Sequence, residues 1–390
     1  EGNTSVMALS AAIVLAAGEG TRMRSNKPKV LHAFAGKTFL NRVMDSVAAL
    51  NPDTLAVVVH FQAERVAEAA RSYDEQVTIV NQDDIPGTGR AVQCAMAQLT
   101  KAGKVDGPVL IAASDMPLLD SETLHRLVEF HTASGNGATV LTTILDDPTG
   151  YGRIIREGGN VVAIVEEKDA DAAQKAVQEI NTGILVLPNA KLEGWLNALQ
   201  SNNAQGEYYL TDLIALANAD GIKVHPVQVR ASHLAAGVNN KVQLAELERI
   251  FQRDQADELL KAGVTLRDPA RFDLRGRLKH GQDVVIDVNC VFEGDVVLGA
   301  DVEIGPNCVI HNAKIGEGSK IEAFSHLEDC EIGARAHIGP YARLRPNAKL
   351  ADEVHIGNFV EVKNTTIGKG SKANHLTYLG DAEIGSKTNI

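Results

Sequence analysis

The chain has 390 residues, which is longer than one small domain, so two or three folding units are expected. Apolar residues make up 44% of it and charged residues 23%, as is typical of a globular protein with a substantial core. The net charge of -12 argues against a nucleic-acid partner, because such proteins usually carry a basic face. It does not exclude small anionic ligands, whose binding depends on local charge.

The cysteines and the N-terminus indicate a cellular setting. Cys94, Cys290, Cys308 and Cys330 form no C-x-x-C pair, which favours reduced thiols in a cytosolic protein over metal ligation. The apolar run after Met7 lacks a basic segment before it and is too short to span a bilayer. We therefore interpret it as a buried strand and expect no stable membrane association. The residues before Met7 are set aside as a candidate artificial extension.

The first part of the chain alternates strand-like and helix-like segments. Short β-rich apolar runs lie at 11–17, 54–60, 77–82 and 109–115, as expected for buried parallel strands. Helical patterns at 39–50 and 63–73 lie between them. This alternation predicts an α/β sheet with crossover helices.

A long polar helix is predicted next, from residue 239 to residue 262. Its apolar positions are compatible with one helical face, and Gly263 lies where a helix would end. These positions are Leu244, Leu247, Phe251, Leu259 and Leu260. We interpret the segment as a helical arm that joins two domains.

A six-residue repeat follows. From Ile286 an apolar residue recurs every six residues as far as Ile390, with five-residue steps to Ile315, Ile332, Ile367 and Ile384. Of the 19 positions, 18 are Ile, Leu, Val or Phe. Ordinary strands with chance spacing would not sustain so long a run. The pattern predicts a triangular parallel β-helix, with the repeated residue pointing inward. The repeat reaches Ile390 with no capping segment, so we expect the chain to be cut short relative to its natural parent.

A glycine-rich loop follows the first apolar run. Gly18 and Gly20 are followed by Thr21, Arg22 and Lys29, but neither a P-loop nor a dinucleotide-binding fingerprint is present. Glycines let backbone N–H groups approach an anion, and basic side chains neutralise phosphates, so the setting favours phosphate binding over a merely solvated basic loop.

Asp115 ends a predicted strand, which is where ligands bind in such sheets. It is a candidate Mg²⁺ ligand, with turn capping beside Pro117 as the alternative.

Several motifs of the chain resemble those of a known family. The pattern from Gly18 to Arg22 with Lys29 is similar to the signature of sugar-1-phosphate nucleotidyltransferases, and the repeat resembles hexapeptide acyltransferases. Together, from Leu9 onward, they resemble the bacterial bifunctional N-acetylglucosamine-1-phosphate uridylyltransferase and glucosamine-1-phosphate N-acetyltransferase. The specific stretches are PGTGRA, DPTGYGRI, EINTGI, NNAQGEYYLTD, DPARFDLRG and KANHLTYLGDAEIG.

The resemblance implies a Rossmann-like nucleotidyltransferase sheet over 7–238, a helical linker over 239–265 and an incomplete left-handed parallel β-helix over 266–390. It implies transfer of uridylyl from UTP to N-acetylglucosamine-1-phosphate, with Mg²⁺, for peptidoglycan and lipopolysaccharide precursors. No general base is needed, because the nucleophile is already an anionic phosphate oxygen.

The resemblance also implies site residues for the first reaction. They are Leu15, Ala16, Ala17 and Gly18 along the nucleotide; Arg22 and Lys29 on the phosphates; Gln82, Gly87 and Thr88 on the uracil; Ala113 and Ser114 beside the nucleotide; Asp115 and Asn239 on Mg²⁺; and Gly152, Glu166 and Asn181 on the sugar. Helix capping is the alternative role for the Asn239–Asn240 pair. Two positions depart from the family: Ser114 replaces a frequent Gly, and Glu19 fills a slot where some relatives have Lys, which would weaken triphosphate binding unless it points to solvent.

For the second reaction the resemblance implies acetyl transfer from acetyl-CoA to glucosamine-1-phosphate. His375 would be the general base, since neutral histidine suits proton transfer near neutral pH. Arg345 and Lys363 would bind the sugar phosphate, Tyr378 and Asn389 the sugar, and Glu361 would help to orient the site. In the family, coils beyond the position of Ile390 complete the acetyl-CoA site, so acetylation by this chain is expected to be impaired. A cytoplasmic homotrimer is expected from the resemblance.

Two alternatives remain open from the sequence. One is a nucleotidyltransferase that makes another product, such as ADP-glucose or dTDP-glucose, although EINTGI and PGTG favour the uridine and N-acetylhexosamine interpretation. The other is a non-catalytic regulatory homologue of a translation-factor exchange complex. Such a protein could dispense with Arg22, Lys29, Asp115 and Asn239, all of which this chain retains.

Overall fold

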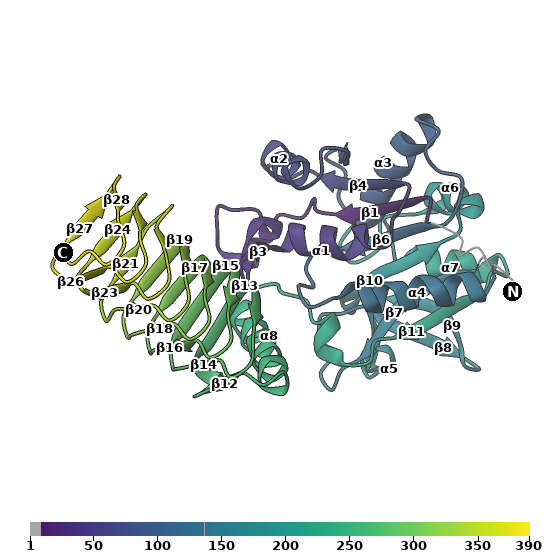
Figure 1. Ribbon diagram of the computed structural model, residues 1–390. Coiled ribbons are helices and arrows are strands. Elements are labelled where there is room, and N and C mark those ends of the chain that lie inside the picture. The colour runs from purple at the N-terminus through teal and green to yellow at the C-terminus, as the bar shows by residue number, and fades with distance from the viewer. Residues whose placement is uncertain (1–8, 136) are drawn as a thin grey trace, which may run out of the picture. The chain divides into compact units, whose positions relative to one another are not determined.

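The computed structural model describes residues 9–135 and 137–390 (Figure 1), so Met7 and the residues before it lie outside the described part. The chain forms two compact units. Among the described residues, the first comprises 9–34 and 38–247, and the second comprises Ala35–Lys37 and Glu248–Ile390. The boundary lies inside the helix that the sequence predicts as an arm.

A nine-stranded sheet forms the centre of the first unit. Its strands are β1 (Ala11–Leu15), β4 (Thr54–Val59), β5 (Thr78–Asn81), β6 (Val109–Ala113), β7 (Ala138–Ile144), β8 (Arg153–Glu157), β9 (Asn160–Val165), β10 (Glu179–Leu187) and β11 (Val224–Gln228). The path runs β11-β7-β10-β6-β1-β4-β5, and β8 pairs with β10 and β9. The four predicted strands are confirmed as β1, β4, β5 and β6.

The sheet is mixed: the four strands that the sequence predicts run parallel, as expected, and β10 adds an antiparallel strand. β1 runs parallel to β4 and β6, whereas β10 runs antiparallel to β6 and β7. β10 returns from the β8–β9 hairpin in the opposite direction and is as buried in its second half as the parallel strands. The apolar pattern of this segment therefore does not indicate the direction in which the strand runs.

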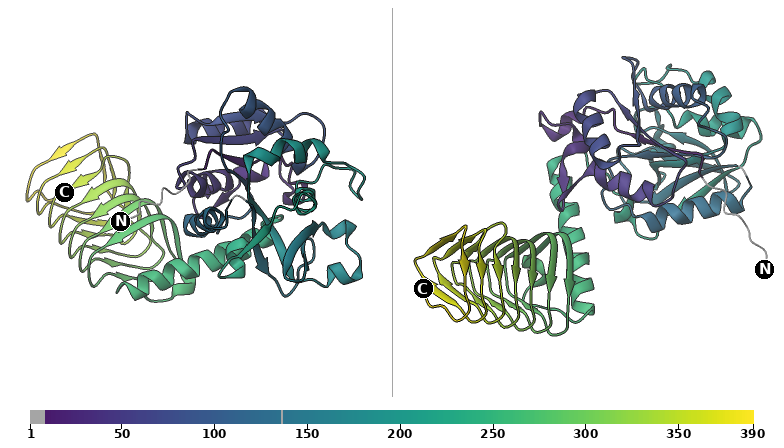
Figure 2. Two further views of the ribbon diagram at one scale, coloured as in Figure 1. Left: turned by 90° about the vertical axis from the view of Figure 1, so that its right-hand side faces the viewer. Right: turned by 45° about the horizontal axis from the view of Figure 1, so that its top comes forward.

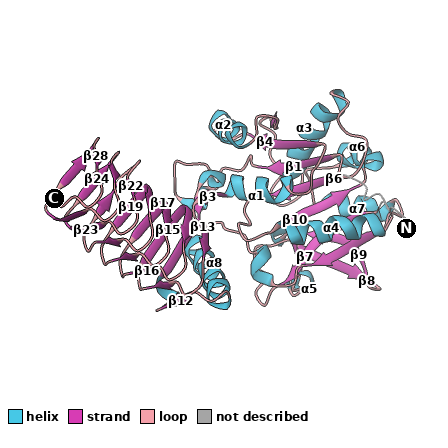
Figure 3. Cartoon of the chain, in the orientation of Figure 1, coloured by secondary structure: helices cyan, strands magenta, loops and turns pink. Residues whose placement is uncertain are grey.

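Helices cover both faces of the sheet (Figure 3). α1 (Phe39–Ala48), α2 (Ala63–Tyr73) and α4 (Ser121–Ala133) pack on the face to which Ala12 and Val14 point. α3 (Thr88–Lys101), α6 (Asn189–Ala198) and α7 (Asp212–Ala219) pack on the face of Ala11 and Ile13. The shorter elements are β2 (Ala33–Phe34), β3 (Lys37–Thr38), α5 (Ala172–Lys175), η1 (Thr21–Met23), η2 (Lys29–Leu31), η3 (Glu167–Asp169) and η4 (Ser232–Ala235).

The predicted arm is the helix α8 (Lys241–Lys261), and it ends where expected, at Gly263 with φ +97°. The predicted apolar face is wrong at Leu260, whose side chain is exposed. The face that packs on the second unit's core runs through Gln252, Ala256 and Leu259. Leu260 lies about 100° from Leu259 around the helix and so points away.

The second unit is a stack of parallel coils, a parallel β-helix (Figure 2). Phe292 pairs with Ile310, and Ile310 with Leu327, so successive coils are 18 and 17 residues apart. These spacings are three hexads, with one five-residue step in the shorter coil. The repeat positions from Ile286 to Ala373 are buried, Leu379 and Ile384 are half-buried, and Ile390 is exposed. The inward-pointing core is confirmed, and the handedness of the coil stays a prediction.

The coils are built from short strands. They are β12 (Thr265–Leu266), β13 (Phe272–His280), β14 (Val285–Ile286), β15 (Cys290–Leu298), β16 (Glu303–Ile304), β17 (Val309–Ile315), β18 (Lys320–Ile321), β19 (His326–Ile332), β20 (His337–Ile338), β21 (Arg343–Leu344), β22 (Lys349–Leu350), β23 (His355–Asn358), β24 (Glu361–Lys363), β25 (Thr366–Ile367), β26 (Lys372–His375), β27 (Tyr378–Gly380) and β28 (Glu383–Ile384), with η5 (Pro269–Arg271).

A buried glutamine closes the first coil. The side-chain amide of Gln252 donates to the carbonyl oxygen of Leu274 at 3.0 Å, and its oxygen accepts from the Leu274 N–H at 2.8 Å. This pair of bonds reproduces what a neighbouring strand would supply. Helix α8 therefore covers an edge that would otherwise expose unpaired backbone groups.

Candidate functional sites

The glycine loop after β1 holds Lys29 in place. Gly20 adopts φ +68°, and a Cβ atom there would lie 2.6 Å from Cβ of Lys29. Only glycine allows this close approach, so the lysine stem packs directly against the turn. Arg22 lies on η1 with an exposed side chain, and Gly18 and Glu19 are exposed in the loop. The exposure of Glu19 agrees with a side chain that points to solvent.

Three predicted residues meet at the carboxyl end of the sheet. The Lys29 ammonium donates to Oδ1 of Asn239 at 2.8 Å and to Oδ2 of Asp115 at 3.4 Å. They lie far apart in the sequence, yet the fold brings them to one point. Their side chains are partly buried, with 15% of Lys29 and 33% of Asp115 exposed. A carboxylate and an amide oxygen are thus gathered next to the glycine loop.

Asn239 is free for this role because its neighbour caps the helix. Oδ1 of Asn240 accepts from the Gln243 N–H at 2.9 Å, and Oε1 of Gln243 accepts from the Asn239 N–H at 2.8 Å. The backbone N–H of Val238 also donates to the carbonyl oxygen of Asp115 at 2.8 Å. Capping thus falls to Asn240, and a backbone bond joins the Asn239 segment to the Asp115 segment.

The ends of β1 and β6 are tied together beside the loop. The buried hydroxyl of Ser114 donates to the carbonyl oxygen of Leu15 at 2.6 Å. The serine side chain therefore adds a hydrogen bond between the ends of β6 and β1. Ala16 is buried below this junction, while Ala17 and Ala113 are half-buried at its surface.

The predicted uracil-binding segment is a tight turn before α3. The Gln82 amide donates to the carbonyl oxygens of Ile85 at 3.1 Å and Gly87 at 3.2 Å. Gly87 has φ +117°, and a Cβ atom there would lie 2.4 Å from the Tyr208 carbonyl oxygen. Oγ1 of Thr88 accepts from the Leu210 N–H at 3.1 Å. The structure therefore brings Gln82, Gly87 and Thr88 together and fixes the turn against a distant segment.

The three predicted sugar residues also converge. The Asn181 N–H donates to the carbonyl oxygen of Gly152 at 2.9 Å, and a Cβ atom on Gly152 would lie 3.5 Å from Oε2 of Glu166. An irregularity in β10 after Asn181 turns Gly183 toward Ala113, whose Cβ would be 3.0 Å from an added one. The predicted sugar residues are thereby linked to the end of β6.

Glu166 is electrostatically unusual. Burial raises the pKa of its carboxyl above the ordinary value, the nearby Asp212 raises it further, and a hydrogen bond from the Thr211 hydroxyl at 2.9 Å partly opposes both. Asp212 also has a pKa raised by burial. Oε2 of Glu166 lies beside Gly152, where a carboxylate oxygen can accept a hydrogen bond from a hydroxyl or amide group.

The donors beside Lys29 fit a hard divalent cation. Asp115 and Asn239 offer oxygen atoms, which Mg²⁺ prefers, and Mg²⁺ usually takes one or two carboxylates plus water and phosphate oxygens. Within residues 9–135 and 137–390 no group of three or more His, Cys, Asp or Glu side chains could hold a metal ion. Asp115 and Asn239 therefore fit a cation whose remaining ligands are water and phosphate oxygens.

In the second unit the predicted residues lie on the last coils. His375 pairs with Asn358 of the preceding coil, and Tyr378 pairs with Glu361. His375, Tyr378 and Asn389 are exposed, and Asn389 forms an isolated bridge with Lys372.

Arg345 and Lys363 are in register, because Leu344 pairs with Val362. They present two positive charges one coil apart. The Glu361 carboxylate lies 3.8 Å from the Arg345 guanidinium and accepts a hydrogen bond from the Arg343 guanidinium at 3.1 Å. It therefore restrains both arginine side chains.

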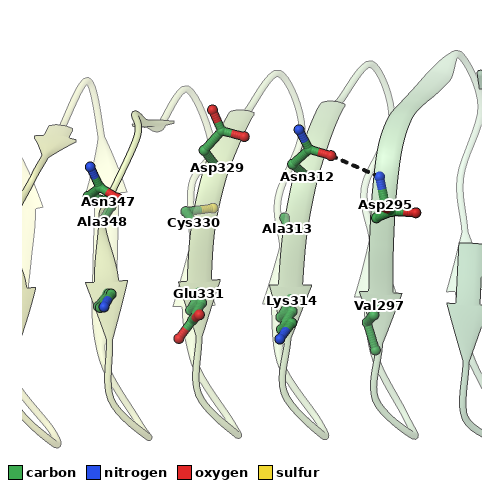
Figure 4. Close-up of a pocket in the computed structure, with 11 residues that line it drawn as sticks. Asp295, Val297, Asn312, Ala313, Lys314, Asp329, Cys330, Glu331, Asn347 and Ala348 are labelled. Atoms are coloured by element: carbon green, nitrogen blue, oxygen red, sulfur yellow. Dashed lines mark hydrogen bonds between the residues drawn. The ribbon is translucent and has the colours of Figure 1, made fainter. Parts of the chain in front are cut away.

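A groove of about 250 Å³ on the second unit is separate from these residues (Figure 4). It crosses β15, β17, β19 and β22, with Lys314 and Glu331 on neighbouring strands. None of the residues predicted from the sequence lines it.

Sequence reasoning missed three supporting residues. Arg153 is buried, pairs with Glu167 and donates to the carbonyl oxygens of Val177 and Lys175, which holds the segment that carries the predicted sugar residues. Thr211 orients Glu166, and Gln243 completes the cap beside Asn239. Arg153 and Thr211 lie in the stretches DPTGYGRI and NNAQGEYYLTD, which signalled the family but gave no role to these positions.

Comparison with known proteins first defines the class. Residues 12–236 match the MobA-like NTP transferase domain, so the first unit is a nucleotidyltransferase domain, and residues 275–377 match the GMPPB C-terminal domain. The bifunctional protein GlmU of Neisseria meningitidis serogroup B is 67% identical over 379 residues, which are 97% of this chain and 81% of that protein. The bifunctional protein GlmU of Bifidobacterium longum is 62% identical over 385 residues, or 98% and 83%.

The chain belongs to the GlmU family of bifunctional proteins. Among solved structures, a UDP-glucose pyrophosphorylase complexed with UDP-glucose matches with 14% identity and a TM-score of 0.49, over 63% of this chain and 99% of that one. In the described residues, no helix has the length and apolar character needed to cross a membrane.

Proposed function

We propose that the first unit transfers uridylyl from UTP to N-acetylglucosamine-1-phosphate, giving UDP-N-acetylglucosamine and pyrophosphate. The observation that carries the proposal is the convergence of Lys29, Asp115 and Asn239 beside the glycine turn. Membership of the GlmU family supports it. The clustering of Gly152, Glu166 and Asn181 supports an N-acetylated sugar as the acceptor.

The chemistry asks for positioning and charge neutralisation. The sugar phosphate oxygen attacks the α-phosphorus of UTP, a new P–O bond forms, and the bond to pyrophosphate breaks. Lys29 and Arg22 bind phosphate oxygens, and the Gln82 turn holds the base at the other end. Mg²⁺ held by Asp115 and Asn239 would neutralise charge on the phosphates when bound.

A substrate panel tests the nucleotide and the sugar. Pyrophosphate release is measured with Mg²⁺ and each of UTP, ATP and dTTP, against N-acetylglucosamine-1-phosphate and glucose-1-phosphate. We expect UTP with the N-acetylated sugar to give the highest kcat/KM. Preference for ATP or dTTP would indicate a different nucleotidyltransferase, and no release with any pair would favour the regulatory alternative.

We propose that the second unit N-acetylates glucosamine-1-phosphate with acetyl-CoA. This replaces the impaired acetylation expected from the sequence, because the bifunctional GlmU proteins, of which the chain covers 81–83%, support this activity and do not support the expected truncation. The amine attacks the thioester carbonyl, the C–S bond breaks, and His375 takes the amine proton and returns it to the leaving thiolate. Arg345 and Lys363 would bind the phosphate, Tyr378 and Asn389 the sugar. Thiol release should be lost in His375→Ala and kept in Lys369→Ala, which removes an exposed charge six residues earlier in the chain. Equal release by both variants would remove the role of His375.

We also propose that the second unit packs against further copies of this chain, as a homotrimer. An apolar ridge made of Phe324, Tyr341, Phe359 and Leu376 runs along one corner of the coils, with the three rings stacked at 5.1 and 5.2 Å. All four residues are exposed, and all have φ between +51° and +59°. A left-handed backbone conformation costs about 1–2 kcal/mol for each such residue, so other interactions must compensate for this cost.

The same corner carries asparagine in earlier coils, at Asn289 and Asn307, which tolerate positive φ. The ridge ends next to His375, so a second copy placed on it would adjoin the sugar residues. Phe359→Asn should lower the mass measured by light scattering to that of one chain while unfolding remains cooperative. Val242→Asn, at an exposed site on α8, is the control. An unchanged mass in the ridge variant would contradict the proposal.

Two features support a cytoplasmic location for this activity. Both proposed reactions use cytoplasmic co-substrates, UTP and acetyl-CoA. The four cysteines are free thiols, as is typical of a reducing compartment. Fractionation of cells that produce the protein tests this location, and recovery in the membrane fraction would oppose it.

A further inference from the structure

A positively charged lysine side chain already lies between the two proposed metal ligands. The Lys29 ammonium is 2.8 Å from Oδ1 of Asn239 and 3.4 Å from Oδ2 of Asp115. These are the two oxygen atoms that the proposed function assigns to Mg²⁺. An ammonium group and a hard divalent cation seek the same acceptor oxygens.

We infer that Lys29 acts as the resident cation of this site, so that free divalent cations are excluded until a nucleotide phosphate draws the ammonium away. The inference rests on the proposed function, because it takes Asp115 and Asn239 as the metal ligands. A divalent cation between these oxygens would lie within a few ångströms of the ammonium. The repulsion between two positive charges at that range opposes joint occupancy.

The packing of Lys29 restricts how it can leave. An added Cβ on Gly20 would lie 2.6, 3.1 and 3.3 Å from Cβ, Cδ and Cγ of Lys29, so the stem is held against the turn. The terminal Cε–Nζ segment is therefore the part that can turn. A short rotation would take the ammonium from the two oxygens toward an anion on the glycine loop.

This arrangement makes cation and nucleotide binding interdependent. A phosphate gives the displaced ammonium a new partner, and the vacated oxygens then accept the cation that accompanies the nucleotide. By thermodynamic reciprocity, the nucleotide must raise the cation affinity by the same factor as the cation raises the nucleotide affinity. Without nucleotide, Asp115 is already neutralised by Lys29, and the affinity for a free divalent cation is low.

The test measures metal binding directly and needs no turnover. Mn²⁺ is titrated into the full chain without nucleotide, and bound Mn²⁺ is followed by water proton relaxation. We expect Lys29→Met, which keeps the stem and removes the charge, to bind Mn²⁺ at least about tenfold more tightly than the wild type, or about 1.4 kcal/mol. Adding Asp115→Asn to Lys29→Met should abolish that gain.

Two controls make the result specific. Lys27→Met removes an equal charge from an exposed position in the same loop and should leave the Mn²⁺ affinity within about twofold of the wild type. Lys29→Gln keeps a donor for Asn239 and should show the same gain as Lys29→Met. Circular dichroism spectra of all variants should match the wild type, and Lys29→Gln provides the measurement if Lys29→Met does not fold.

The outcomes separate this inference from the function on which it rests. Equal nucleotide-free Mn²⁺ affinities for the wild type and both Lys29 variants, with Mn²⁺ still bound in the presence of UTP, would overturn the inference and leave the metal site intact. No protein-bound Mn²⁺ in any variant, even with UTP, would overturn the proposed metal site and the inference with it.

Discussion

The contact between Gly20 and Lys29 yields a sharp prediction. Gly20→Ala introduces a Cβ atom at φ +68° and 2.6 Å from Cβ of Lys29, against ordinary contacts of 3.4–4 Å. The lysine stem must therefore retreat by roughly 1 Å, and its ammonium moves away from the proposed phosphate position. Misplacing a positioning group by about 1 Å can cost about 10²-fold in rate.

Gly103→Ala provides a matched control. Gly103 has the same φ of +68°, with nothing within 4 Å of an added Cβ, so this variant carries the backbone strain without the clash. Both variants should lose about 1–2 kcal/mol of stability from the strain. Only Gly20→Ala should also lose about 10²-fold in kcat/KM for pyrophosphate release, equivalent to about 2.7 kcal/mol of activation free energy.

The assay is steady-state pyrophosphate release at several UTP concentrations, with urea denaturation of each variant alongside it. Since a displaced Lys29 weakens phosphate contacts, the loss should include a higher KM for UTP. The reasoning is refuted if kcat/KM of Gly20→Ala stays within about threefold of that of Gly103→Ala.

Three further predictions concern buried polar groups. The raised pKa of Glu166 means that its carboxyl binds a proton more tightly in the folded state than in the unfolded state, so the contribution of Glu166 to stability falls as pH rises through the folded pKa. Glu166→Gln should therefore be more stable than the wild type at pH 8, by about 1.4 kcal/mol for each tenfold difference in proton affinity between the two states. At acidic pH, below both pKa values, the variant should show no such gain. Urea titrations at both pH values check this, and a gain that does not vary with pH would contradict it. Arg153→Met removes the buried donor to the carbonyl oxygens of Val177 and Lys175 and should cost about 1–3 kcal/mol in urea denaturation, whereas full stability would show that Arg153 does not hold this segment. Gln252→Leu leaves the N–H of Leu274 unpaired, while Gln255 still donates to the Leu274 carbonyl oxygen, and should cost about 1–3 kcal/mol in chemical denaturation; full stability would show that the Gln252 side chain does not help α8 to cap the coil.

The β-helix core was predictable because each of its contacts repeats. An inward residue in one coil stacks on its equivalent in the next, so the pattern of six and five residues encodes the pairing register itself, as Ile310 and Leu327 show. The short strands of the first unit were also predictable, since their apolar runs are buried on both faces. The antiparallel direction of β10 was not, because burial does not depend on strand direction.

The sites depend on contacts that cannot be predicted from the sequence. Lys29 and Asn239 are 210 residues apart, and only the folded sheet brings them within 2.8 Å. Motifs pointed to these residues individually but not to the bond between them. Gln252 is a polar residue of α8, yet it is buried because its side chain bonds the N–H and carbonyl of Leu274 in the first coil, a role that the sequence pattern does not indicate. Roles that depend on a partner's position therefore need the structure.

The measurement that tests the account most directly is pyrophosphate release from UTP, N-acetylglucosamine-1-phosphate and Mg²⁺ by the wild type and Asp115→Ala. Asp53→Ala, on an exposed loop at the other end of the sheet, is the control. We predict robust release by the wild type and the control, and a loss of at least about 10²-fold in Asp115→Ala, because removal of the carboxylate leaves one protein ligand for the cation. Equal rates for all three proteins would contradict the placement of the metal and phosphates at Lys29, Asp115 and Asn239.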